Sequence, residues 1–184
     1  MVALLLPSLD RLPAYMNALA QGWSPNTTRD VTGEQLAAIE SDPAAFVADL
    51  LRHEGGGPVV AADGSVHERL PFRIFWIHDG AGTFCGAINL RFQHGTLALP
   101  PHVSGHVGYA VVPWMRCRGI ATAALRLILP VAHGLGLPRV LLTCDVDNEP
   151  SARVIAANGG VPAGIEPTGP HGAAKRLFWV ETAE

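Results

Sequence analysis

Charged residues and cysteines are scarce in this sequence, and each shortage excludes a class of function. Charged side chains make up 16% of the 184 residues, and 13 basic against 16 acidic residues give a formal net charge of −3. A mildly acidic chain without a basic run does not fit a nucleic-acid binder, so we expect no nucleic-acid partner. Cys85, Cys117 and Cys144 stand far apart and form no zinc-ligand spacing, so we expect free thiols and no bound metal.

Long hydrophobic runs are also missing. No stretch approaches the ~18 apolar residues of a membrane span. The apolar start at residues 2–6 is too short for a signal peptide and has no basic residues before it. We therefore expect a cytoplasmic protein without a membrane partner. The apolar fraction of 48% is high enough for a substantial core, and the length predicts a single domain over residues 1–184.

Strand-like and helix-like segments alternate along the chain, and their order predicts one domain of mixed α/β (α+β) class. Residues 59–71 are polar and predict irregular structure, and Pro130 predicts a kink or an early end of the helix that it interrupts. The predicted strands are residues 2–6, 72–78, 84–92, 106–112, 140–144 and 177–181, and the predicted helices are residues 9–20, 33–40, 118–133, 151–158 and one that Asp42 caps.

One stretch carries chemistry: within residues 111–122 a strand ends, a short basic loop follows and a helix begins. The first turn of a helix has unpaired N–H groups and a partial positive charge, which favour phosphate. Gly119 lets the backbone approach a ligand closely, and Arg116 and Arg118 add positive charge. The pattern predicts an anion site, and the alternative is an ordinary strand–turn–helix with solvated arginines.

The same stretch resembles the pyrophosphate-binding motif of the GNAT acetyltransferase superfamily, whose pattern is Q/R-x-x-G-x-G/A. Arg116, Gly119 and Ala121 match its three fixed positions. Residues 105–113 resemble the strand that precedes this motif, and residues 148–160 resemble a later N-x-x-S helix that ends in glycine. The chain also looks like a bacterial subgroup of predicted acetyltransferases that carry GHxGY and TCDxDN segments.

The resemblance covers residues 72–181 and implies a fold and a co-substrate. The implied fold is GNAT-like: a central mixed, mostly antiparallel twisted sheet of roughly six to seven strands, flanked by about four helices. The sheet would be splayed between its fourth and fifth strands, here residues 106–112 and 140–144. Acetyl-CoA would fill this gap as the co-substrate, and no metal is implied.

The resemblance also implies site residues, position by position. The pantetheine arm would pair with the backbone of Val111 and Val112, and the Val112 N–H would donate to the thioester oxygen. Asn148 and Ser151 match positions beside the pantetheine arm, but Asn148 fits a helix cap equally well, and Ser151 fits an ordinary first-turn residue. The pyrophosphate would lie beside Arg116 on the backbone N–H groups of Arg118, Gly119, Ile120, Ala121 and Thr122.

Two positions are candidates for the general base. His106 occupies the place of the carboxylate base of many relatives, and a histidine titrates near neutral pH; the alternative is a surface histidine at the start of a strand. Asp145 is the second candidate, with a turn-forming role as its alternative. Ile155 stands where relatives carry a tyrosine acid, and Tyr109 does not occupy that position.

We therefore expect an acetyl-CoA-dependent N-acetyltransferase. It would move an acetyl group to a primary amine of a small molecule or a protein, by direct attack in a ternary complex. The alternative is a non-catalytic module that binds coenzyme A or acyl-CoA as a sensor or partner. The sequence does not identify the acceptor amine, and it leaves a homodimer open.

Overall fold

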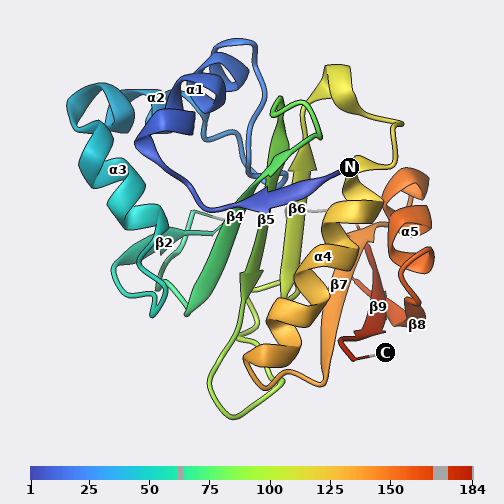
Figure 1. Cartoon of the computed structure of the whole chain (residues 1–184). Helices are drawn as coiled ribbons and strands as arrows, with labels where there is room; N and C mark the ends of the chain where they lie inside the picture. The colour runs from blue at the N-terminus through green and yellow to red at the C-terminus, as the bar shows by residue number, and fades with distance from the viewer. Residues whose placement is uncertain (62–63, 168–173, 184) are drawn as a thin grey trace.

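Two antiparallel sheets stand side by side in the computed structural model, which describes residues 1–61, 64–167 and 174–183 (Figure 1). The strands of these sheets are β1 (Ala3–Leu5), β4 (Phe72–His78), β5 (Phe84–Arg91), β6 (Val107–Val111), β7 (Arg139–Asp145), β8 (Val161–Glu166) and β9 (Lys175–Glu181). The first sheet has the order β1–β4–β5–β6, and the second has the order β7–β9–β8. The predicted mixed α/β class and antiparallel pairing are thus confirmed.

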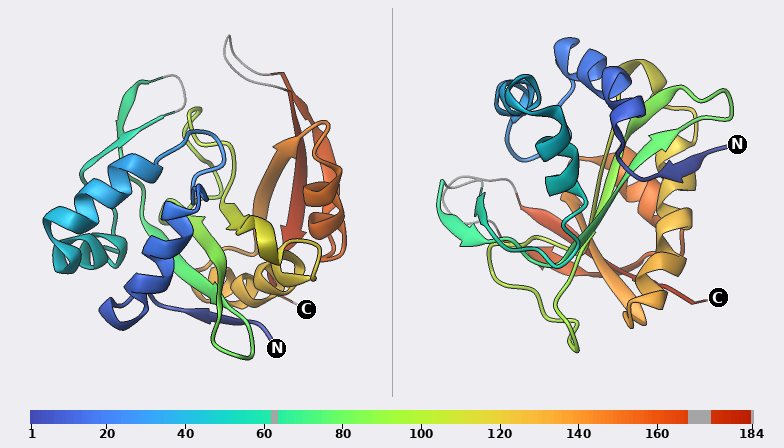
Figure 2. Two further views of the ribbon diagram at one scale, coloured as in Figure 1. Left: turned by 90° about the horizontal axis from the view of Figure 1, so that it is seen from above. Right: turned by 60° about the vertical axis from the view of Figure 1, so that its left-hand side comes forward.

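Helices cover both faces of the first sheet. α1 (Leu12–Ala20) lies on one face and α4 (Ile120–Gly134) lies across the other, as Figures 1 and 2 show. α5 (Glu149–Ala156) lies beside α4 and contacts β7. α2 (Thr32–Ser41) and α3 (Pro43–Leu50) follow α1 at the edge of the molecule. This arrangement leaves α4 and α5 on one side of the two sheets and the N-terminal helices on the other.

An aromatic cluster fixes α1 on the first sheet. Tyr15 stacks on Trp76 of β4 with ring centroids 4.8 Å apart, and it meets the edge of Phe84 of β5 at 5.7 Å. Trp23, which follows α1, meets Phe84 at 5.3 Å. Such pairs add about 0.5–1.5 kcal/mol each beyond the burial of their area. The Tyr15 hydroxyl also donates to Gln35, so the same cluster holds α2 in place.

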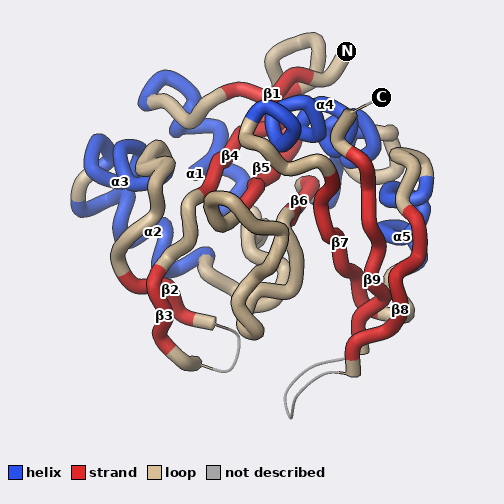
Figure 3. Tube along the Cα trace, turned by 90° about the horizontal axis from the view of Figure 1, so that it is seen from below, coloured by secondary structure: helices blue, strands red, loops and turns tan. Residues whose placement is uncertain are grey.

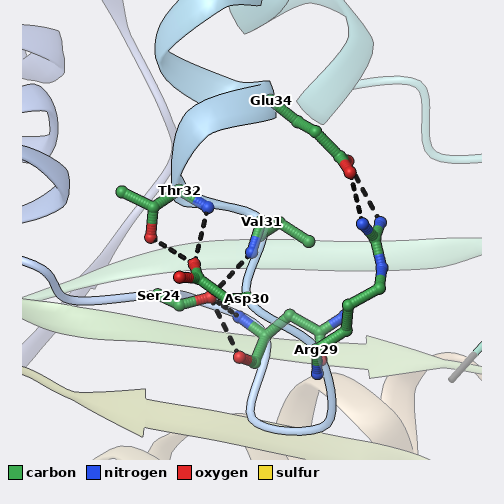
Figure 4. A network of polar contacts seen from close by, with 7 residues as sticks. Ser24, Arg29, Asp30, Val31, Thr32 and Glu34 are labelled. Atoms are coloured by element: carbon green, nitrogen blue, oxygen red, sulfur yellow. Dashed lines mark hydrogen bonds and ion pairs between the residues drawn. The ribbon is translucent and has the colours of Figure 1, made fainter.

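Side chains hold the turn that leads into α2 (Figure 4). The Asp30 carboxylate accepts the backbone N–H of Thr32 at 2.9 Å and its hydroxyl at 2.5 Å. The backbone bond satisfies a donor that has no partner inside the helix. Arg29 and Glu34 form an ion pair over the same turn, with Nη2 and Oε2 3.1 Å apart. These contacts begin α2 at Thr32, one residue before the predicted start.

Three strands are not predicted by the sequence pattern. β2 (Pro58–Val60) and β3 (Val66–Glu68) form a hairpin where residues 59–71 predict irregular structure. Each of these strands has three residues, too few to show a hydrophobic alternation, and every residue of β8 is exposed. Neither short strands nor a fully exposed strand gives the period-two signal on which strand prediction depends.

The α4 helix continues through Pro130 to Gly134, so the early end predicted at this proline is wrong. Pro130 is exposed and lies in the last turns of the helix. The backbone carbonyl that loses its N–H partner there can bond to water, so the helix tolerates the proline.

Candidate active site

The two sheets meet at His106 and then part. The backbone N–H of His106 donates to Leu141 O at 2.8 Å, and the Leu141 N–H donates to Nδ1 of the His106 ring at 2.9 Å. The ring nitrogen thus takes the place of a backbone carbonyl in this last pair. Gly105 permits the close contact, because a Cβ there would lie 3.0 Å from Leu141 O. Beyond this point β6 and β7 belong to different sheets, which diverge as Figure 2 shows.

The backbone of β6 presents every second residue to the gap between β6 and β7. Successive residues of an antiparallel strand direct their N–H and C=O groups to opposite sides. Two hydrogen bonds to β5 show which residues of this segment face that strand. The Arg91 N–H donates to His106 O at 2.8 Å, and the Val112 N–H donates to Cys85 O at 3.0 Å. The residues that face β5 are Gly108, Ala110 and Val112, and those that face the gap are Val107, Tyr109 and Val111.

Val111 and Val112 therefore differ in what they can bind. The Val112 N–H is bonded to Cys85 O, so the expectation that it donates to a thioester oxygen is wrong. The Val111 N–H faces the gap, while the Val111 carbonyl accepts the Nε–H of Arg116 at 3.2 Å. The donors that this strand edge offers to a ligand are the N–H groups of Val107, Tyr109 and Val111.

The N-terminus of α4 follows the end of β6. Gly119 caps this helix in the left-handed conformation, with φ of +72°, which residues with a side chain rarely adopt. The Ala123 N–H donates to Gly119 O at 3.0 Å, so the N–H groups of Ile120, Ala121 and Thr122 have no acceptor inside the helix. These three N–H groups and the positive end of the helix dipole form an anion site of the predicted kind.

Two exposed arginines border this anion site. Arg116 is anchored by its bond to Val111 O, which leaves the other N–H groups of its guanidinium available. Within the described part of the chain, neither Arg116 nor Arg118 belongs to an ion pair. No carboxylate of the described residues therefore competes with an anion at the helix N-terminus for these two guanidinium groups.

One hydrogen bond crosses the gap from β6 to α5. The Asn148 Oδ1 accepts the N–H of Ser151 at 3.1 Å, so Asn148 is the cap of α5. The Ser151 hydroxyl lies 2.6 Å from the hydroxyl of Tyr109, which is 42 residues away in the sequence. Burial raises the pKa of Tyr109 to about 12, so its hydroxyl stays protonated at neutral pH. The sequence pattern gave no signal for this contact.

A second contact that the sequence pattern missed joins α5 to α4. Asn158 follows α5, and its amide donates to Val154 O at 2.8 Å and to Thr122 O at 3.2 Å. Because Thr122 belongs to the first turn of α4, this amide ties the end of α5 to the turn that forms the anion site.

His106 is fully buried, with 0% of its surface exposed, so the surface-histidine alternative is wrong. Burial, together with the nearby Arg91 guanidinium, lowers the pKa of the ring to about 4, and the ring is neutral at pH 7. Nδ1 accepts the Leu141 N–H, so the ring proton lies on Nε2, which has no acceptor among the described residues. His106 thus offers a donor, and no free lone pair, at the start of the gap.

The other positions considered for proton transfer have structural partners. Asp145 ends β7, and its carboxylate pairs with Lys175 Nζ at 2.6 Å. Ile155 is fully buried in the core. Neither side chain stands free beside the gap.

A cavity of about 280 Å³ lies against the face of the second sheet that points away from α4 and α5. Leu141, Leu177 and Trp179 line it on the side of the sheet, and residues 97–101, 103 and 104 of the loop before β6 line it on the other side. Figure 3 shows this loop between the β2–β3 hairpin and the second sheet. The His106 ring lies 6.1 Å from the ring of Trp179, so the cavity adjoins the point where the sheets part.

Within residues 1–61, 64–167 and 174–183, no three His, Cys, Asp or Glu side chains are placed to hold a metal ion. None of the helices in these ranges combines the length and hydrophobicity needed to cross a membrane.

Comparisons with known proteins point to one family. A family model described as an acetyltransferase (GNAT) domain matches residues 18–161. The chain is similar to RimL, a ribosomal L7/L12 α-N-protein acetyltransferase solved with coenzyme A, at 15% identity and a TM-score of 0.67, over 100% of this chain and 96% of that one. A search of curated proteins finds no match.

Two further solved structures share the fold. RimJ of Mycobacterium smegmatis, in complex with a CoA-disulfide, is 22% identical with a TM-score of 0.66, over 98% of this chain and 81% of that one. The microcin C7 self-immunity acetyltransferase MccE, in complex with acetyl-CoA and AMP, is 15% identical with a TM-score of 0.62, over 98% of this chain and 92% of that one.

The His106 contact predicts how stability depends on pH. The pKa of His106 is about 4 in the folded chain and ~6.5 for an unfolded histidine, so the unfolded chain binds more protons between these values. The stabilisation by the neutral ring is fully present above about pH 6.5 and is lost as the pH falls toward about 4, by at most about 3 kcal/mol.

Urea unfolding of the wild type and of His106→Asn over this pH range measures the effect. The Asn Oδ1 can accept the Leu141 N–H, but the amide does not titrate. Carboxylates titrate in both proteins, so the stability advantage of the wild type should shrink as the pH falls. An advantage that stays constant with pH contradicts a lowered pKa of His106.

Proposed function

The chain belongs to the GNAT family of acetyltransferases, and on that premise we propose that it moves the acetyl group of acetyl-CoA to a primary amine of a small molecule or a protein. The observation that carries the proposal is the gap between β6 and β7, with free N–H groups along β6 and the N-terminus of α4 next to its end. RimL and RimJ hold coenzyme A, and MccE holds acetyl-CoA, in structures of the same fold. RimL acts on a ribosomal protein, which supports a protein acceptor.

The pyrophosphate of acetyl-CoA would accept hydrogen bonds from the first-turn N–H groups of Ile120, Ala121 and Thr122. Arg116 and Arg118 would neutralise its charge, and bonds from charged donors are about twice as strong as neutral ones. The approach is open at the helix cap, because no other described residue lies within 4 Å of the place where a Cβ of Gly119 would stand.

The pantetheine arm would then run along the edge of β6. The backbone N–H groups of Tyr109 and Val111 face it. Val112 supports the strand from behind: its N–H donates to Cys85 O of β5, and its carbonyl accepts the Met115 N–H. Asn148 and Ser151 stand across the gap at the start of α5, where Ser151 meets the Tyr109 hydroxyl. Apart from Val112, the cofactor residues inferred from the sequence would border this proposed path.

The transfer forms an N–C bond and breaks the C–S bond of the thioester; the amine loses a proton and the departing thiolate gains one. Direct attack fits two of the three thiols, because Cys85 and Cys144 are buried and burial raises the pKa of both, whereas Cys117 is exposed. A protonated buried thiol is not a nucleophile. The N–H of Tyr109 or Val111 would donate to the thioester oxygen as negative charge develops there.

The alternative function is a non-catalytic module that binds coenzyme A or acyl-CoA. One observation favours it: Nδ1 of His106 and the carboxylate of Asp145 both have partners within the chain, so neither is a free base. Thiol release from acetyl-CoA, measured with a panel of primary amines, separates the two functions. An enzyme releases thiol in proportion to acetylated amine, whereas a module that only binds leaves acetyl-CoA intact.

We expect Gly119→Glu to weaken coenzyme A binding by about tenfold or more, because it places a carboxylate beside the pyrophosphate and a side chain at a left-handed position. Calorimetric titration with coenzyme A measures the change. Gly119→Asn is the matched control, because asparagine tolerates this conformation and carries no charge. Equal affinity of a folded Gly119→Glu variant and the wild type would exclude the anion site.

The role of His106 as general base stays a prediction, and the geometry favours a positioning role. We expect His106→Ala to lower kcat, because it removes the acceptor of the Leu141 N–H where β6 and β7 part. His106→Asn, which restores an acceptor, should keep most of the activity. A loss of about 10²–10⁴-fold in both variants would instead support proton transfer by His106.

The Tyr109 hydroxyl, which meets Ser151 across the gap, is our candidate for stabilising the leaving thiolate. Its high pKa keeps the proton on the phenol, so it can donate a hydrogen bond while solvent supplies the proton. We expect Tyr109→Phe to lower kcat by about 10–100-fold with little change in coenzyme A affinity. Tyr15→Phe is the control, because the Tyr15 hydroxyl bonds to Gln35 away from the gap. If kcat is unchanged in Tyr109→Phe, the Tyr109 hydroxyl does not stabilise the leaving thiolate.

A further inference from the structure

The face of the first sheet that points away from α4 carries an arginine on β5. Residues that pair across an antiparallel ladder share a face. Trp76 packs on Tyr15 of α1, and the ladder places Asn89, Arg91 and Gly108 on this same face. The guanidinium of Arg91 lies over β6, because a Cβ on Gly108 would stand 3.0 Å from its Nη2 and 3.3 Å from Asn89 Oδ1.

This guanidinium has no partner in the described part of the chain. Arg91 takes part in no ion pair there, and its enclosed Nε has no acceptor. Burial lowers the pKa of Arg91, and no carboxylate offsets the effect, although an arginine remains charged in a protein. The Nε2–H of His106, whose backbone carbonyl accepts the Arg91 N–H, also has no acceptor among the described residues.

Arg73 of β4 is a comparable arginine whose guanidinium has hydrogen-bond acceptors within the chain. Its Nη1 donates to His53 O at 3.1 Å and to Phe72 O at 2.8 Å, and its guanidinium lies 5.6 Å from the centre of the Phe92 ring. Arg73 and Arg91 are both half-buried on neighbouring strands. Among the described residues, Arg91 therefore lacks the partners that satisfy Arg73 on the neighbouring strand.

A cation taken out of water without a counter-ion destabilises a fold, so buried charges are normally paired. Arg91 lies over Gly108, and the two neighbours of Gly108 in the chain, Val107 and Tyr109, face the gap. A molecule whose amine reaches this gap from the side of α1 would pass beside the guanidinium. Its planar set of donors matches the two oxygens of a carboxylate or of a phosphate.

We infer that Arg91 binds an anionic group, a carboxylate or a phosphate, on the acceptor whose amine is acetylated. The inference rests on the proposed function, and it names the class of acceptor: a primary amine that carries an anionic oxygen group near the amine. Asn89, next to the guanidinium on the same face, and the Nε2–H of His106 are further donors.

Acetylation of matched amines tests this inference. The pairs are glycine with glycinamide, the dipeptide seryl-aspartate with seryl-asparagine, and aminoethyl phosphate with ethanolamine; the last pair separates phosphate from carboxylate. In at least one pair, the anionic member should have a kcat/KM higher by about 10–100-fold. An amide lowers the pKa of the neighbouring amine, so amine ionisation alone would favour glycinamide over glycine.

Arg91→Met is the variant that tests whether Arg91 causes this preference, and Arg73→Met is its matched control. Arg91→Met should reduce the preference for the anionic amine to about one, and Arg91→Lys should restore part of it; Arg73→Met should retain it. A preference that survives Arg91→Met, or the absence of any preference while amines are acetylated, overturns the inference.

Thermal unfolding gives a readout that does not depend on turnover. Arg91→Met should raise the midpoint of unfolding, because it removes an unpaired charge, whereas Arg73→Met should lower it. In the presence of coenzyme A, at least one of the three anionic amines should raise the midpoint of the wild type and not that of Arg91→Met. If no amine is acetylated, the proposed function fails, and these shifts alone decide the role of Arg91. If Arg91→Met lowers the midpoint as much as Arg73→Met does, Arg91 has a structural role and the inference is wrong.

Discussion

The pairing of His106 with Leu141 determines where the two sheets part, and the candidate active site depends on that point. A backbone pair at this position would continue the ladder, whereas a ring nitrogen accepts one N–H and presents no further carbonyl to β7. The bond satisfies the Leu141 N–H, which would otherwise be buried without an acceptor. The neutral state of the ring follows from its burial and keeps Nδ1 available as the acceptor.

The register of β6 against β5 determines which backbone groups of β6 face the gap. Since Val112 is bonded to Cys85, the alternation along the strand leaves the N–H groups of Val107, Tyr109 and Val111 on the open edge. A shift of one residue would exchange these groups with those bonded to β5 and would turn the Tyr109 side chain away from Ser151. The same register therefore sets both the donors for a substrate and the hydroxyl pair across the gap.

Local features of the site could be predicted from the sequence, and contacts between distant segments could not. The strand, the basic loop and the helix around Gly119 lie within a dozen residues, so their pattern predicted the anion site and the family. The bonds of His106 to Leu141 and of Tyr109 to Ser151 span 35 and 42 residues, and no local pattern encodes them. Val112 was misassigned for a related reason: which of two neighbouring residues faces the gap depends on a register that only the paired strand fixes.

An arginine without an ion-pair partner indicates a ligand only where its guanidinium is buried. Arg29, Arg69 and Arg176 form ion pairs that hold loops and strands together, and an exposed arginine without a partner is simply hydrated. Arg116 and Arg118 are exposed, so their position at the α4 N-terminus, rather than the lack of a partner, connects them to an anion. Arg91 differs because its Nε is enclosed without an acceptor among the described residues and its guanidinium lies over Gly108 of β6. A fold that keeps such a group loses stability unless a substrate supplies the opposite charge, so the arginine is best explained by what binds beside the gap.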